Sequence, residues 1–254
     1  MLFMLLLSLP AWGKEKRMPI IKIYYDNTTI RQEVKPAWGF SALIKDGENN
    51  ILFDTGGDAQ VLAANMKKMG SDPKYIEFVI ISHEHWDHAG GLSAVLQPKQ
   101  KVFLLKSFPN NLKNKVKSSG AQLFEITRSQ EIIPGVYTTG ELGTGIKEQS
   151  LIVNTDKGLV IVTGCSHPGI VNIVRHSKDL LKREVYFVVG GFHLLDLSEN
   201  QVKKIIGELK ALGVKKIAPC HCTGEKAIAL FQEEYKKDFI KVGAGSIIDT
   251  AGLN

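Results

Sequence analysis

The 254-residue sequence has few cysteines, no block of like charges and no apolar run of membrane-spanning length. Its three cysteines are an odd number, so a complete disulfide framework is excluded. The apolar stretch at residues 1–13 is shorter than the roughly 20 residues that a transmembrane helix needs. The formal net charge is +6, but lysines and acidic residues are interleaved. We therefore expect a small, anionic substrate, no nucleic acid and no stable membrane span.

Low-complexity tracts, long linkers and tandem repeats are also absent. With 44% apolar and 23% charged residues, the composition is that of a globular protein, which excludes the disordered and collagen-like classes. A chain of this length buries a sizeable core without a structural staple. The sequence leaves the oligomeric state open.

The N-terminal segment permits two interpretations. Residues 1–13 resemble the apolar region of a secretory signal, with a small-x-small cleavage site at Ala11-Trp-Gly13, but the basic residues expected ahead of them are missing. An exported, periplasmic protein with residues 1–17 as a signal or extra segment is slightly favoured. The alternative is a cytoplasmic protein that starts at Met18. Both interpretations set residues 1–17 apart from the fold.

Short β-branched runs alternate with helical stretches from Pro19 onward, which is an α/β pattern. Turn sequences at 45–50 and 155–158 predict hairpins, so the sheets should be mixed. Ser198-Glu-Asn-Gln201 is a capping box ahead of apolar residues at helical spacing. The predicted strands are 20–25, 40–44, 51–53, 75–82, 102–105, 151–154, 159–163, 185–189 and 215–218, and the predicted helices are 58–69, 198–212 and 223–236, with a surface helix and a strand between 109 and 129.

Six of the seven histidines closely follow the ends of predicted strands. The carboxyl ends of sheet strands are where open α/β folds bind ligands. Asp54, directly after the strand at 51–53, joins the same edge. The six histidines are His83, His85, His88, His167, His193 and His221.

The motif His83-Glu-His-Trp-Asp-His88 points most directly to metal binding. Residues i and i+2 of an extended segment face the same way, so His83 and His85 can bind one ion. The chain can then turn and offer Asp87 and His88 to a second ion. Three imidazoles and a carboxylate suit zinc, and also iron or manganese.

This motif and the earlier Phe53-Asp-Thr-Gly-Gly57 together resemble the metallo-β-lactamase fold superfamily. Gly164–Gly169, Gly190–Leu194 and Pro219–Gly224 are similar to the branch that includes 7,8-dihydropterin-6-methyl-4-(β-D-ribofuranosyl)aminobenzene-5′-phosphate synthase. The resemblance implies an αββα sandwich of two mixed β-sheets with helices on the outer faces. It also implies a single domain over residues 18–254, with a metal centre at one edge of the sheets.

The resemblance assigns roles to individual residues. Asp54 corresponds to an aspartate that orders the metal-binding loops, and His221 to a late histidine that completes the second site. Asp87 would also orient the nucleophile, and His193 is expected to be a catalytic acid or base, a substrate contact or a ligand. The expected metal ligands are His83, His85, Asp87, His88, His167 and His221.

Two positions depart from the superfamily pattern. Cys165 stands where many members have a bridging aspartate, and Glu148-Gln149 stands where they have a histidine. His167 is expected to supply the missing nitrogen. Whether Cys165, His167 or Glu148 contacts metal stays open, because Cys165 could equally be a small core residue.

Three further residues near the motifs have simpler interpretations. Cys220 and Cys222 alternate with His221, so if His221 faces metal, the two cysteines should face away and serve packing. Trp86 is either an apolar wall of the pocket or a core residue.

These residues predict hydrolytic chemistry. Two divalent ions would lower the pKa of a bound water toward about 7. Zinc is the expected metal, and manganese, iron and magnesium are the alternatives. We expect a dinuclear zinc hydrolase in which a metal-bound hydroxide attacks an ester, lactone or phosphoester. A transferase similar to the synthase is the first alternative. A redox protein on the same fold is the second, although diiron members place Glu where this chain has His85.

Overall fold

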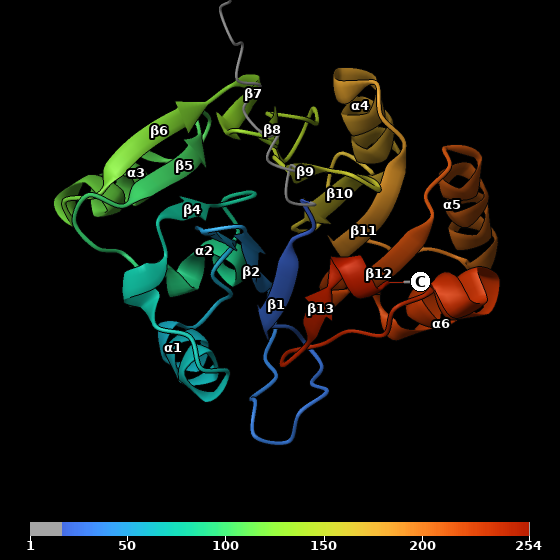
Figure 1. The fold of residues 1–254 in the computed structure, drawn as a ribbon, viewed down its shortest axis with the longest axis horizontal. Helices are drawn as coiled ribbons and strands as arrows, with labels where there is room; N and C mark the ends of the chain where they lie inside the picture. Colours follow the sequence, from blue (N-terminus) through green and yellow to red (C-terminus); the bar gives the residue numbers. More distant parts are fainter. Residues whose placement is uncertain (1–16, 254) are drawn as a thin grey trace, which may run out of the picture.

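Two β-sheets pack face to face, with helices on their outer sides (Figure 1), in the computed structural model, which describes residues 17–253. The sheets have seven and six strands. In spatial order the first contains β13 (Ile247–Asp249), β1 (Ile20–Tyr25), β2 (Ser41–Asp46), β3 (Asn49–Phe53), β4 (Phe78–Ile80), β5 (Lys101–Leu105) and β6 (Gln122–Ile126). The second contains β12 (Lys216–Cys220), β11 (Val185–Gly191), β10 (Gly158–Thr163), β9 (Leu151–Thr155), β8 (Val136–Gly140) and β7 (Arg128–Ile133).

Both sheets are mixed, as the hairpin turns predict. Strands β3 to β6 run parallel, as do β10 to β12, and the other neighbours are antiparallel. The α-helices are α1 (Ala59–Lys68), α2 (Trp86–Ala89), α3 (Asn110–Ser118), α4 (Ile170–Leu181), α5 (Glu199–Ala211) and α6 (Glu225–Tyr235). Short 3₁₀ helices are η1 (Pro73–Tyr75), η2 (Gly90–Ala94), η3 (His221–Thr223), η4 (Lys236–Asp238) and η5 (Thr250–Gly252).

The core has two layers because successive side chains of a strand point to opposite faces. In β10, Val160 and Val162 belong to the core between the sheets. Leu159 and Ile161 belong instead to the core beneath α4, α5 and α6. The alternation confirms the predicted αββα sandwich, in which every β10 residue is buried.

Several elements differ from the sequence prediction. The strand expected at 75–82 covers only Phe78–Ile80, because Asp72 caps a 3₁₀ turn over Pro73–Tyr75. Strands β7, β8 and β13 were not predicted. The sequence of β7 has no alternation of apolar and polar residues that would indicate a strand, and none of its side chains is fully buried. The surface helix and strand expected between 109 and 129 are confirmed as α3 and β6.

The two sheets place their strand ends at a common edge. Asp54 follows β3, His83 follows β4, Cys165 follows β10 and His221 follows β12. The suggested signal segment at residues 1–13 lies outside the described residues. Within the described part of the chain, no helix is long and apolar enough to cross a membrane.

Candidate metal centre

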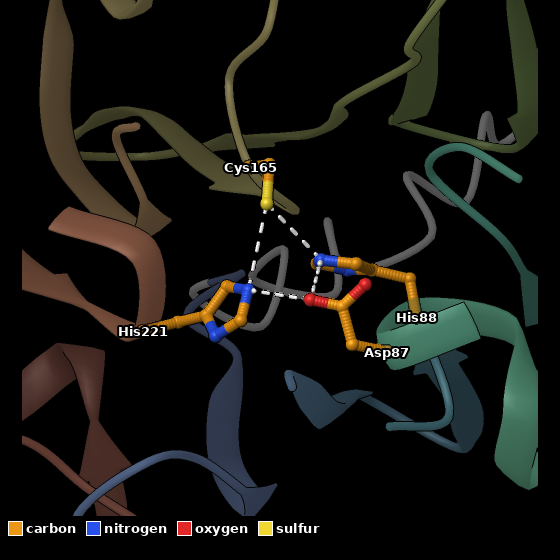
Figure 2. Close-up of side chains that lie close together, drawn as sticks. All are labelled: Asp87, His88, Cys165 and His221. Carbon is orange, nitrogen blue, oxygen red and sulfur yellow. Dashed lines mark hydrogen bonds and ion pairs between the residues drawn. The ribbon is translucent and has the colours of Figure 1, made fainter. Parts of the chain in front are cut away.

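Four buried side chains from three segments converge at the edge between the sheets (Figure 2). Asp87 and His88 lie on α2, Cys165 on the loop after β10, and His221 on η3. Cys165 Sγ is 3.2 Å from His88 Nε2 and 3.4 Å from His221 Nε2. Asp87 Oδ2 is 3.4 Å from His221 Nε2 and 3.7 Å from His88 Nε2. We call these four residues the buried tetrad.

The spacing of the buried tetrad fits a four-coordinate metal ion. Ligands 2.0 to 2.3 Å from a tetrahedral ion are about 3.3 to 3.8 Å apart, and the four donor separations given above span nearly the same range. Two imidazoles, a carboxylate and a thiolate are donors that zinc accepts. The tetrad therefore suits one divalent ion.

A second donor group adjoins the tetrad and shares Cys165 with it. The ligand atoms of His83, Cys165 and His167 lie within 4.8 Å of one another. His83 Nε2 is also 3.1 Å from His85 Nδ1. His167 Nε2 is buried and has no hydrogen-bond partner among the described residues. A buried orphan nitrogen costs free energy unless something binds it, so this nitrogen is consistent with a metal ligand.

Asp54 fixes one imidazole in each group. Its Oδ2 accepts hydrogen bonds from His88 Nδ1 and Ser82 Oγ, both at 2.7 Å. Because the Ser82 hydroxyl donates its proton to Asp54, it accepts from His83 Nδ1 at 2.9 Å. In their neutral forms both imidazoles therefore carry the proton on Nδ1 and have an unprotonated Nε2, as a metal ligand must. These hydrogen bonds are the ones expected of a carboxylate that orients the candidate ligands.

The loop after β1 orients His221 in the same way. Asn27 Oδ1 accepts from His221 Nδ1 at 3.0 Å, and Asn27 Nδ2 donates to the His221 carbonyl at 3.1 Å. Asp26, which is buried, accepts from the His221 backbone N–H at 2.8 Å. Sequence reasoning missed both residues because they lie almost 200 positions before His221. Their only local signal is a polar pair directly after a predicted strand.

The structure brings Glu148 to the centre's outer side. Its Oε1 accepts from the backbone N–H groups of Cys165 and Ser166 at 2.9 and 2.8 Å. Its Oε2 accepts from the His167 backbone N–H at 2.7 Å. Both carboxylate oxygens are thus used to shape the loop that carries two of the candidate ligands. Burial raises the pKa of Glu148 to about 7, against the lowering effect of these N–H groups.

His193 and Cys222 form a further group at the mouth of the centre. His193 is exposed, and its ring centroid is 4.3 Å from that of His167. The ligand atoms of Cys165, His193 and Cys222 lie within 4.8 Å of one another. The expectation that Cys222 faces away was wrong: η3 is a 3₁₀ turn, so residues 221 and 222 do not alternate like strand residues. Cys220, on β12, does pack into the core.

The remaining motif residues are arranged as follows. His85 is half-buried at the start of α2, and Trp86 is 64% exposed, which rules out the core alternative for Trp86. Gly164 has no room for a side chain, because a Cβ would lie 2.1 Å from Ser82 Oγ. The loop thus needs glycine to bring Cys165 to the tetrad.

Strained backbone is concentrated here. Asp54, Ser166, His193 and His221 all have positive φ, between 51° and 66°. This left-handed conformation is unfavourable for residues other than glycine, by about 1–3 kcal/mol at such sites. Packing and hydrogen bonding elsewhere hold these residues in place, with Ser166 Oγ, for example, donating to the Gly191 carbonyl.

The electrostatics favour neutral imidazoles on His83 and His167, in the second donor group, and an ionised carboxylate on Asp87, in the buried tetrad. Burial and the neighbouring imidazoles lower the pKa of His83 far below its usual range and that of His167 to about 4. Burial opposes protonation of His88, but the charge and hydrogen bond of Asp54, together with the charges of Asp87 and Glu148, raise the pKa of His88. Burial likewise opposes the charge of Asp87, yet the hydrogen bond with His221 and the charge of His88 lower the pKa of Asp87 to about 2.

Comparisons with known proteins agree with this architecture. Residues 39–103 match the family model of the metallo-β-lactamase superfamily. The chain is 34% identical to 7,8-dihydropterin-6-methyl-4-(β-D-ribofuranosyl)-aminobenzene-5′-phosphate synthase of Methanocaldococcus jannaschii, over 90% of this chain and 96% of the synthase. A solved metal-dependent hydrolase of the β-lactamase superfamily shares 31% identity at a TM-score of 0.78, over 91% of this chain and 98% of that one. Human tRNase Z, short form, shares the fold at 12% identity and a TM-score of 0.65, over 91% and 99% of the two chains. The chain belongs to the metallo-β-lactamase superfamily, in the branch that resembles the Methanocaldococcus synthase.

Proposed function

We propose that the protein is a metal-dependent hydrolase that cleaves an ester, a lactone or a phosphoester. It would use two divalent metal ions, and zinc is the metal that we propose. The observation that carries the proposal is the presence of two adjacent donor groups with Cys165 in both. Asp87, His88 and His221 would hold one ion, and His83, His85 and His167 the other. Cys165 would take the position between them.

The chemistry of the donors supports this loading. His167 Nε2 is buried without a partner, and the tetrad spacing matches a tetrahedral ion. Hydrogen bonds from Nδ1 leave Nε2 unprotonated on neutral His83, His88 and His221. When bound, two such ions would polarise the carbonyl or phosphoryl oxygen of the substrate and lower the pKa of a water molecule.

The protein's own residues would complete the reaction. The Asp87 carboxylate faces the space inside the tetrad, where it accepts a hydrogen bond from the attacking water and orients it. His193 stands at the exposed side of His167. Its contact with Cys222 raises the pKa of His193 from its ordinary value, so its imidazole is suited to donate a proton to the leaving group.

A transferase is the second candidate, and one observation favours it. The synthase relative is 34% identical over 90% of this chain. In a transferase, ions held by the same donors would bind a diphosphate or phosphate group, and His193 would exchange a proton with the acceptor group instead of with water.

The test is hydrolysis by zinc-loaded protein of a chromogenic phosphodiester and of a lactone, before and after treatment with a chelator. The proposal predicts turnover that the chelator abolishes and that added zinc restores. Zinc binding without any hydrolysis would reject the hydrolase in favour of the transferase. His193→Gln provides a matched variant, which should lower kcat while leaving the zinc content unchanged.

A further inference from the structure

A groove of about 1180 Å³ opens beside His221 and is not explained by the metal-binding donors. Its walls come from the loop after β1, the loop between β11 and α5, and helix α6. Sites that bind small molecules are concave and lined mainly by apolar and aromatic side chains. Of ten large apolar side chains exposed in the described part of the chain, four line this groove: Ile30, Trp38, Leu195 and Leu197.

Trp38 forms the part of this wall that lies nearest the metal centre. Its ring centroid is 5.3 Å from that of His221, with 62° between the ring planes. Trp38 is nevertheless 46% exposed, so much of the indole is free to contact a bound molecule. A flat indole offers its largest contact to another flat ring, by offset stacking or an edge contact.

Hydrogen bonds hold the Trp38 segment rigidly against the centre. On one side of it the Ala37 N–H donates to the Asp26 carbonyl, and on the other the Gly39 N–H donates to Asn27 Oδ1. Gly39 itself has a φ of 138°, and a Cβ there would lie 2.4 Å from the Asp87 carbonyl. Asn27 also orients His221, so the indole and the candidate ligand share one support. A ring that contacts Trp38 is therefore placed at a defined distance from the donors, with little ordering cost.

We propose that Trp38 and the groove beside it bind a planar aromatic group of the substrate and so determine its class. This inference rests on the proposed function, because it takes the metal centre as the place of reaction. The groove exceeds the upper end of the usual 300 to 1,000 Å³ range of ligand sites. It has room for fused rings and a further substituent.

Calorimetric titration of zinc-loaded protein tests the assignment with two probes that share one carbon skeleton. The probes are 2-naphthoate, which is flat, and decahydro-2-naphthoate, which is saturated and puckered. We expect naphthoate to bind at least tenfold more tightly. In Trp38→Leu, which keeps apolar bulk, naphthoate should lose at least tenfold in affinity while the saturated probe stays within twofold. Tyr75→Leu is the matched control, because Tyr75 is 62% exposed but lines a different cavity.

Equal affinities of the two probes, no detectable naphthoate binding, or unchanged naphthoate binding by Trp38→Leu would each overturn the inference. Zinc content is measured in every variant, since Trp38 contacts His221. Naphthoate binding with the expected pattern but without chelator-sensitive hydrolysis would reject the proposed function and leave the aromatic groove intact. Chelator-sensitive hydrolysis without discrimination between the two probes would support the proposed function and reject the aromatic groove.

Discussion

Asp54 Oδ2 lies 2.7 Å from His88 Nδ1, and the same oxygen reaches His83 through the Ser82 hydroxyl. One buried carboxylate thus sets the proton position on an imidazole of each donor group. The two candidate metal positions are coupled before any ion binds. Asp54 is accordingly the residue where a small chemical change should affect both positions.

Asp54→Asn tests this coupling. An asparagine amide nitrogen in place of Oδ2 cannot accept from His88 Nδ1, so the proton moves to Nε2 and blocks the metal-facing nitrogen. Loss of such an orienting partner typically lowers metal affinity 10- to 100-fold, and we expect a loss in this range. Competition with a chromogenic chelator measures it. Zinc affinity equal to that of the parent would contradict the role given to Asp54.

Glu148→Gln separates a loop-shaping role from a ligand role. Both carboxylate oxygens accept backbone N–H groups, and a glutamine leaves at least one of these donors facing an amide nitrogen. A buried unsatisfied donor costs about 1–3 kcal/mol, so the metal-free protein should lose about that much unfolding free energy in urea. A variant with unchanged metal-free stability and weakened zinc binding would show instead that Glu148 is a ligand.

Cys165→Ser tests the shared donor. Cobalt-loaded parent protein should show a near-ultraviolet thiolate-to-metal absorption, because Cys165 Sγ lies within both donor groups. The band should disappear in Cys165→Ser and persist in Cys222→Ser, the matched control. Persistence of the band in Cys165→Ser would assign the thiolate to another cysteine and remove Cys165 from the centre.

His167 should make the stability of the metal-free protein depend on pH. Burial and the nearby His193 and His85 lower its folded-state pKa to about 4, below the value of about 6.5 in the unfolded chain. Between these values the unfolded chain binds the extra proton, so this contribution to stability falls as the pH drops from 6.5 toward 4. Urea unfolding of parent and His167→Gln in chelator, from pH 7.5 to 4.5, measures it. The stability of the parent relative to the variant should decline with acidification; a constant difference would contradict the environment described for His167.

Local motifs predicted the fold class, and they named most of the residues that the structure brings together at the candidate site. The His83–His88 motif places its candidate ligands within six residues, so the bend after β4 and the short helix α2 suffice to bring them together. The alternation of side chains along strands such as β10 likewise accounts for the two layers of the core. Glu148 and Cys165 were recognised only as departures from a pattern, and their roles needed the three hydrogen bonds of the loop.

Other features depend on tertiary contacts that no local pattern encodes. Asn27 meets His221 from a distant segment of the chain, and nothing near Asn27 in sequence indicates the partner. Cys222 was misassigned because alternation holds for a strand, whereas η3 is a 3₁₀ turn. The exposure of Trp38 is likewise a property of the assembled loops. The polar strand β7 pairs with β8, which in turn pairs with β9, and the sequence of β7 alone does not indicate this pairing.

The zinc content per chain of parent and Asp87→Ala tests the central claim most directly. Both proteins are loaded with zinc, desalted and analysed for zinc, with far-ultraviolet circular dichroism as the check on folding. The account predicts two zinc ions in the parent and at most one in Asp87→Ala, with the helix and strand signal unchanged. A parent that retains no more than one ion, or an Asp87→Ala variant that retains two, would contradict the dinuclear centre.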